Sequence, residues 1–265
     1  MLNPIGYRQV PLDPNLVGWF EADKINNVNT ALPSNGGAVV NWFDISGRGS
    51  IPTQGTAANQ PSFSTNVANG NPAVTFNSDA GGANGDSLTS NNATYLSNLN
   101  LANAATGFTI FVCAQIDNAT PPSGVSGALI FMQGSSINTN EQFQIIQISS
   151  GQISNSVINL SGIQRTVTSG NATANVPFIN SFWWDKANTT IAGQFNSNSV
   201  VTGSNSVTGI NGSPTLFAIG QQKAGQPTRF FDGKIFAILI YSRFLSSTER
   251  QYVKQYLGSK YGVTV

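Results

Sequence analysis

The stretch Phe108-Thr-Ile-Phe-Val-Cys-Ala-Gln-Ile-Asp117 decides the fold. Apolar residues occupy both its odd and its even positions, so a strand over 108–116 would present apolar side chains to both faces of a sheet. Such a strand belongs in the centre of a sheet that is covered on each side. Cys113, the only cysteine of the chain, lies within this stretch and is expected to be a small core residue.

Outward from this stretch, short apolar runs are separated by clusters of Gly, Asn, Ser and Pro, a pattern typical of a β-sandwich or β-barrel. Long loops are predicted at about 22–38, 77–107, 118–127 and 196–214, and loops of that length in a compact domain are commonly functional. The predicted strands are Val17–Glu21, Val39–Phe43, Ala73–Phe76, Phe108–Asp117, Ala128–Met132, Phe143–Ile148, Ser156–Leu160, Arg165–Thr168, Asn180–Trp184, Thr190–Phe195, Leu216–Ile219 and Lys234–Tyr241.

One helix is predicted, between Ser246 and Gly262 at the C-terminal end. Ser246 and Glu249 have the spacing of a capping box, in which each side chain reaches the backbone N–H of the other residue. Gly262 can adopt the left-handed conformation that ends a helix. An apolar stripe along the helix is expected to pack on the edge of the sandwich, and it consists of Val253, Tyr256, Leu257 and Tyr261.

The composition excludes several classes of function. Charged residues make up only 9% of the 265 residues, the net charge is +1, and Lys and Arg form no cluster. Nucleic acids and anionic membranes are therefore not expected as partners, because binding them needs concentrated positive charge. The absence of histidine removes the Ser-His-Asp and Cys-His mechanisms. The chain contains 31 asparagines and few charged residues. Surfaces of such composition are common on extracellular and virion proteins.

Residues 1–15 are predicted to form an extended N-terminal arm, and residues 16–265 a single sandwich domain. Pro4, Pro11 and Pro14 keep the arm extended, and its apolar side chains favour contact with another surface or subunit. The N-terminal residues lack the basic start and apolar stretch of a signal peptide. An exterior protein of this kind would either have had its signal removed or leave its host inside a virus particle.

Several phrases follow one another in a family-like order: Leu16-Val-Gly-Trp-Phe-Glu-Ala-Asp23, Val40-Asn-Trp-Phe-Asp-Ile-Ser-Gly47, Gln60-Pro-Ser-Phe63, Gly70-Asn-Pro-Ala-Val-Thr-Phe76, and Phe231-Asp-Gly-Lys-Ile-Phe-Ala-Ile-Leu-Ile-Tyr-Ser-Arg-Phe-Leu-Ser246 with Tyr256-Leu-Gly-Ser-Lys-Tyr-Gly262. Together they resemble the laminin-G-like branch of the concanavalin A-like lectin and glucanase superfamily. The resemblance implies an all-β, two-sheet antiparallel, jelly-roll-like sandwich, a type that also occurs in phage fibres and virion surface proteins. It implies little about activity, because members bind glycans, bind proteins or hydrolyse polysaccharides. Relatives often carry Glu in the final strand, where this chain has Ala237.

Few carboxylates have a pattern that suggests catalysis or metal binding. Glycosidases of this superfamily use a Glu-x-Asp-x-Glu strand, and Glu21-Ala-Asp23 matches only its first part, so no catalytic residue is predicted. Asp44 is expected to accept N–H groups of the turn that follows it. Asp79 and Asp86, in a Gly-rich loop, are weak candidates for a Ca²⁺ site. Their spacing matches no calcium loop, so we predict no metal and no other cofactor.

The phrase Ser181-Phe-Trp-Trp-Asp185 contains the candidate binding residues. Strand alternation places Trp184 on one face, expected to be the core, and Trp183 and Asp185 on the other. An outward Trp183 beside Asp185 would suit a sugar, because the ring can stack on a pyranose while the carboxylate accepts hydroxyls. Alternatively, Trp183 packs under a loop or against another subunit. Tyr95, in the predicted 77–107 loop, is a second candidate for an exposed aromatic.

These observations predict a non-catalytic, lectin-like surface module of a phage or similar particle, located at the virion surface or, alternatively, outside a cell. Its expected partners are a host glycan or a neighbouring virion protein, together with further copies of the chain in a homo-oligomer. Two alternatives stay open: a purely structural capsid or tail decoration protein, and a secreted polysaccharide hydrolase.

Overall fold

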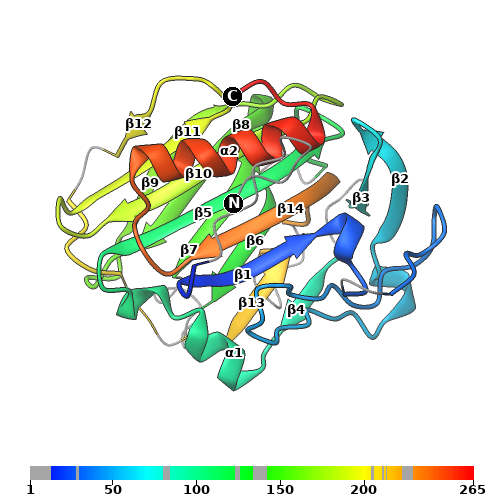
Figure 1. Ribbon diagram of the computed structural model, residues 1–265, viewed down its shortest axis with the longest axis horizontal. Helices are drawn as coiled ribbons and strands as arrows, with labels where there is room; N and C mark the ends of the chain where they lie inside the picture. Colours follow the sequence, from blue (N-terminus) through cyan, green and yellow to red (C-terminus); the bar gives the residue numbers. More distant parts are fainter. Residues whose placement is uncertain are drawn as a thin grey trace, which may run out of the picture.

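The computed structural model is a sandwich of two antiparallel β-sheets with a C-terminal helix across one outer face (Figure 1). The predicted fold class is therefore confirmed. In the part of the chain described, no helix is both long enough and apolar enough to cross a membrane. The residues described are 13–27, 30–79, 84–122, 126–133, 142–203, 206–210, 212, 214–222 and 229–265.

The described strands form one sheet of eight strands, sheet A, and one of six, sheet B. Sheet A has the order β12-β11-β10-β5-β14-β3-β2, with β1 also pairing with β14, and sheet B has the order β4-β13-β6-β7-β8-β9. Sheet A contains β1 (Leu16–Glu21), β2 (Ser62–Ala68), β3 (Asn71–Phe76), β5 (Gly107–Ile116), β10 (Phe178–Asp185), β11 (Thr190–Phe195), β12 (Val201–Thr202) and β14 (Gly233–Tyr241). Sheet B contains β4 (Leu88–Ser90), β6 (Ser126–Gln133), β7 (Phe143–Ile148), β8 (Gln152–Ile158), β9 (Gln164–Asn171) and β13 (Leu216–Ile219).

The central strand β5 lies between β10 and β14, and all ten of its residues are buried. Phe108 and Ile110 point into the core between the two sheets, while Phe111 and Cys113 point into a second core on the outer face of sheet A. The prediction of a central strand covered on both faces is confirmed, and Cys113 is a buried core residue.

The second core is covered by α2 (Ser247–Tyr261). Its capping box between Ser246 and Glu249 is present, and Gly262 ends the helix with a φ of 72° in the left-handed region, both as predicted. Val253 and Leu257 pack with the outer-face residues of sheet A. The helix thus crosses a face of the sandwich rather than its edge, as Figure 1 shows.

The region predicted as a loop at 77–107 also contains regular structure. It includes β4, the short helix α1 (Ala93–Asn98) and a 3-10 turn, η3 (Leu101–Asn103). The Asn92 side chain accepts a hydrogen bond from the Tyr95 N–H and begins α1. The other described 3-10 turns are η1 (Ala22–Lys24), η2 (Ala57–Asn59) and η4 (Ser149–Gly151).

The predicted strand Val39–Phe43 is wrong. Its backbone bonds to several separate loops, since the Trp42 N–H donates to the Pro52 carbonyl and the Phe43 N–H donates to the Ile25 carbonyl. Only isolated bridges remain, at Ala38 and Asn41. The neighbouring β2, which the sequence did not suggest, pairs with β3 at the edge of sheet A.

Residues 1–12 of the predicted arm lie outside the described residues, so its role stays a prediction. The residues that follow bond to the sandwich. The Ser242 N–H donates to the Asn15 carbonyl at 2.8 Å, just after β14.

Candidate functional site

Three segments that are far apart in the sequence meet at one end of the sandwich. Gly233, the first residue of β14, pairs with both Ile116, the last residue of β5, and Phe76, the last residue of β3. Asp232 therefore lies between the segments that leave β3 and β5. A Cβ atom on Gly233 would come within 2.3 Å of the Gln115 carbonyl oxygen, so the close approach of these chains requires glycine.

A shallow, open cleft of about 670 Å³ lies where these segments meet. Among the described residues, its lining combines hydroxyl, amide and carboxylate groups with small apolar surfaces: Ser78, Asn118, Ala119, Thr120, Pro122 and Asp232. Asn118 and Thr120 are exposed, and Ser78 and Asp232 are half-buried.

Asp232 and Asn118 form the polar centre of this cleft. The Asn118 Nδ2 donates a hydrogen bond to Asp232 Oδ2 at 2.9 Å, which fixes the amide relative to the carboxylate. Within the described residues, no other side chain hydrogen-bonds to the Asp232 carboxylate, so its Oδ1 can accept from a ligand. The second N–H of the Asn118 amide can donate to one.

The loop that carries Asn118 is held through its backbone. Gln147 of β7 is fully buried, and its Nε2 donates to the Asn118 carbonyl at 2.6 Å and to the Ala119 carbonyl at 3.2 Å. The Gly151 N–H donates to the Ala119 carbonyl at 2.7 Å. Because Gln147 and Gly151 hold the loop through these carbonyls, its side chains remain available for a ligand.

Beside the cleft, the carboxylate of Asp117 forms an ion pair with Lys234. Lys234 Nζ lies 2.6 Å from Asp117 Oδ1, and both side chains are partly buried. The Asp117 N–H also donates to the Asp232 carbonyl at 3.2 Å. Asp117 therefore helps to hold the site in place. Asp232 is the only charged residue in the described lining of the cleft.

The two weak metal candidates, Asp79 and Asp86, instead form hydrogen bonds within the segment next to Ser78. Asp86 accepts hydrogen bonds from both the N–H and the Nδ2 of Asn77, the residue before Ser78. Burial raises the pKa of Asp86, and these two hydrogen bonds act against that rise. Asp79 accepts from the N–H and the Nδ2 of Asn84. In the described parts of the chain, no three His, Cys, Asp or Glu side chains gather where they could hold a metal ion.

The expectation that Trp183 is an exposed sugar platform is wrong. Strand parity is as predicted, because Trp184 lies in the core between the sheets and Trp183 on the opposite face. That face, however, is covered by α2, and the Arg250 guanidinium lies 4.0 Å from the centre of the Trp183 ring. Trp183 is only 4% exposed, so its ring face is not open to a sugar. Asp185 accepts hydrogen bonds from the N–H and the Nδ2 of Asn188 and closes the turn after β10.

Tyr95 is also buried, which corrects the second expectation of an exposed aromatic. Its ring packs edge-on against Phe217 in the core between the sheets, and 1% of the residue is exposed. The cause is α1, which turns Tyr95 and Leu96 inward. Neither Tyr95 nor Trp183 lines the cleft, which lies at the other end of β5 from the Trp183–Asp185 pair.

The fragment Glu21-Ala-Asp23 is part of the contact between β1 and α2. Lys260 Nζ lies 3.0 Å from Glu21 Oε2 and 2.9 Å from Asp23 Oδ1. The Tyr256 hydroxyl donates to Glu21 Oε1 at 2.7 Å. Burial of Tyr256 and the charge of Glu21 raise the pKa of that hydroxyl above its usual value. Both carboxylates are thus bound to the helix that covers them.

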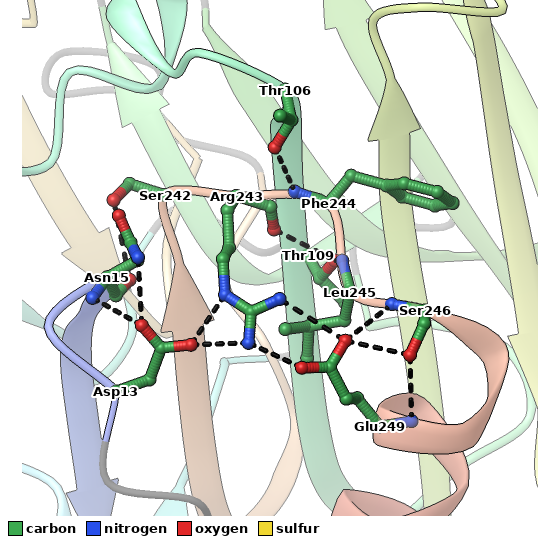
Figure 2. Close-up of polar contacts among 10 residues, drawn as sticks. All are labelled: Asp13, Asn15, Thr106, Thr109, Ser242, Arg243, Phe244, Leu245, Ser246 and Glu249. Carbon is green, nitrogen blue, oxygen red and sulfur yellow. Dashed lines mark hydrogen bonds and ion pairs between the residues drawn. The ribbon is translucent and has the colours of Figure 1, made fainter.

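A second ionic cluster, at the opposite end of the sandwich from the cleft, is drawn in Figure 2. The Arg243 guanidinium lies between the carboxylates of Asp13 and Glu249, with Nη2 2.7 Å from Glu249 Oε1. Glu249 also accepts from the Ser246 N–H, which begins α2. The cluster joins the entry to β1 with the start of α2, so its role is structural.

Asp44 has the structural role that the sequence predicts. Its Oδ1 accepts the N–H of Ser46, and its Oδ2 accepts the Ser46 hydroxyl. It also accepts the Trp19 N–H at 2.9 Å, which ties the turn to β1.

The sequence did not identify the cleft. Its one visible signal is Asp232-Gly233, which is equally typical of an ordinary turn. Asn118 lies in a predicted loop, but nothing local connects it with a residue 114 positions away.

No family model matches the chain, and no curated protein matches it. Among solved structures, the chain is similar to the Trypanosoma rangeli sialidase in complex with 2,3-difluorosialic acid, with a TM-score of 0.57 and 14% identity over 98% of this chain and 36% of that one. It is also similar to the CBM40 module of the Ruminococcus gnavus IT-sialidase bound to α2,3-sialyllactose, with a TM-score of 0.46 and 17% identity over 58% of this chain and 90% of that one. The chain thus spans about a third of the length of the first protein. At 14% identity, the likeness to the sialidase shows the fold alone.

Proposed function

We propose that the protein is a non-catalytic, lectin-like module that binds a glycan in the cleft at Asp232 and Asn118. The observation that carries the proposal is the fixed pair of a carboxylate and an amide, 2.9 Å apart, in an open cleft. Sugar hydroxyls both donate and accept hydrogen bonds, so a carboxylate acceptor beside an amide donor matches two neighbouring hydroxyls. The backbone bonds from Gln147 support the proposal, because a loop already held in place loses little entropy on binding.

The absence of catalysis is part of the proposal. Hydrolysis with retention needs two carboxyl groups about 5–5.5 Å apart, one of them a nucleophile. Glu21 and Asp23 are the only paired acids of the predicted catalytic type, and Lys260 binds both. Asp232 has no second carboxylate in the described lining of the cleft.

A glycan array followed by isothermal titration calorimetry on the best glycan tests the proposal. Asp232→Asn should weaken binding at least tenfold, because hydrogen bonds to charged groups contribute about 1.5–3 kcal/mol, and Asn118→Ala should weaken it about fivefold, because a neutral hydrogen bond contributes about 1 kcal/mol. Asp185→Asn is the matched control, since Asp185 also accepts from an asparagine Nδ2 but lies at the other end of β5. Equal binding by all three variants would place the site elsewhere, and no binding on the array would refute the function.

The setting of the module is a separate proposal. A virion surface, with coat subunits as neighbours, remains a prediction from the sequence alone. Detecting the protein in purified particles by mass spectrometry would support it.

A further inference from the structure

We infer that the cleft selects neutral sugars and rejects sugars that carry a carboxylate, such as sialic acids. This inference rests on the proposed glycan-binding function and adds the class of ligand. It follows from the charge and the hydrogen-bonding capacity of the groups at the cleft.

The charge of the described lining is negative. Asp232 is its only charged residue, and the other described lining residues are neutral. Lys234, two positions along the chain, is bound to Asp117 at 2.6 Å. Arg229, three positions before Asp232, donates to the Gln222 side chain at 2.7 Å. Lys234 is therefore already paired with a carboxylate, and neither Lys234 nor Arg229 belongs to the described lining of the cleft.

The hydrogen-bonding capacity points in the same direction. An ionised carboxylate only accepts, and Asp232 Oδ1 has no donor among the described residues. A sugar hydroxyl can donate to that oxygen, whereas an ionised carboxylate on a ligand cannot. Because Asp232 is half-buried, repulsion between two carboxylates there is stronger than in bulk water.

A pair of adjacent hydroxyls meets both needs of the site. One hydroxyl donates to Asp232 Oδ1, and its neighbour accepts the second N–H of the Asn118 amide. The hydrogen bond at 2.9 Å between the two side chains sets the spacing of these two groups. Ser78 and Thr120 add hydroxyls that can donate or accept, and neither adds charge.

The test is an array on which each neutral glycan is printed beside its sialylated derivative, with lactose and 3′-sialyllactose as one such pair. We expect at least tenfold stronger binding to the neutral member. The affinity for the neutral member should change little between 50 and 300 mM NaCl. Tighter or equal binding of the sialylated member would overturn the inference but leave the proposed function intact. Binding to neither class anywhere on the array would refute the proposed function itself.

A second variant measurement separates charge from blocked access, because a terminal sialic acid can also hide the sugar beneath it. Asp232→Asn removes the charge and keeps the shape. If charge causes the rejection, this variant should bind neutral sugars more weakly and bring the neutral-to-sialylated ratio at least threefold closer to one. An unchanged ratio would overturn the inference. Asp185→Asn should change neither quantity, since the Asp185 carboxylate accepts its described hydrogen bonds from Asn188 of its own turn, at the other end of β5.

Discussion

The two ends of β5 contain the same kinds of residue and use them differently. At the Gly107 end, Asp185 accepts from an asparagine three positions along the chain and closes a turn. At the Ile116 end, Asp232 accepts from Asn118, 114 positions away. The local pair leaves little for a ligand, whereas the long-range pair joins two loops and lines a cleft. The binding site at this end therefore arises because the fold brings distant segments together, and no single stretch of the sequence contains it.

The two ends of β5 also differ in how far other elements cover them. The Gly107 end is closed by the start of α2, whose Arg250 lies on Trp183, and by the Arg243 cluster (Figure 2). At the Ile116 end, Asn118 and Thr120 remain exposed. Stability should therefore depend mainly on the covered end and binding on the open end, which substitutions can test.

The largest effect is expected for Trp183→Ala. The ring is 4% exposed and lies beneath Arg250, so its removal should lower the free energy of unfolding by about 3 kcal/mol, as for a core truncation. Glycan binding should be unchanged, because Trp183 does not line the cleft. Urea denaturation and calorimetry measure the two quantities. A variant with normal stability and lost binding would restore Trp183 as the sugar platform.

The next effect is the loss of the double ion pair at the covered end. Arg243→Met leaves Asp13 and Glu249 without their common cation and should cost about 1–2 kcal/mol. Lys234→Met at the open end is the matched control, because among the described residues Lys234 pairs with one carboxylate, that of Asp117, and it should cost less than about 1 kcal/mol. Chemical denaturation of both variants at low salt compares the two ends directly. Equal losses would show that the Arg243 cluster contributes no more than a single pair.

The pH dependence of the free energy of unfolding should separate the effect of charge in the Arg243 cluster from that of packing. The hydrogen bonds from Arg243, followed by those from Ser246, lower the pKa of Glu249 to about 2. A carboxyl with a lowered folded-state pKa stabilises the fold above its unfolded pKa of 4.5, and that contribution is lost as the pH falls towards 2. About a third of the Glu249 side chain is exposed, so screening reduces the effect to about 1 kcal/mol.

Glu249→Gln tests this, because Gln keeps the shape and can still accept the Ser246 N–H. The stability difference from the unmodified protein should be near its full value at pH 6 and should shrink between pH 4.5 and pH 2. A difference that does not vary with pH would show that Glu249 acts through the cap alone.

Much of the fold was predictable because local patterns carried it. The apolar residues at both parities of 108–116 identified the central strand, and the capping box with Gly262 identified α2. The prediction failed where tertiary contacts override local pattern. Val39–Phe43 is apolar enough for a strand, but its backbone bonds to loops that sequence spacing does not reveal.

The site was predictable only in part. Alternation correctly assigned Trp183 and Trp184 to opposite faces, but parity does not say what covers a face. The helix that covers Trp183 was itself predicted, yet its position across sheet A was not. The cleft depends on which strands neighbour β14, and no periodicity in the chain encodes that order.

The smallest change in stability is expected at the cleft itself. Asn118 is exposed, and its loop is held by Gln147 through backbone carbonyls that a side-chain substitution does not alter. Asn118→Ala should therefore change the free energy of unfolding by less than about 0.5 kcal/mol, as for an ordinary surface site. Gln147→Leu should cost about 1–3 kcal/mol, because it removes a buried donor and leaves the Asn118 carbonyl without its partner, while the Ala119 carbonyl keeps the Gly151 N–H. Thermal melts of the two variants give the comparison. If Asn118→Ala destabilises as much as Gln147→Leu, the Asn118–Asp232 pair holds the fold together, and the open end is not kept for a ligand.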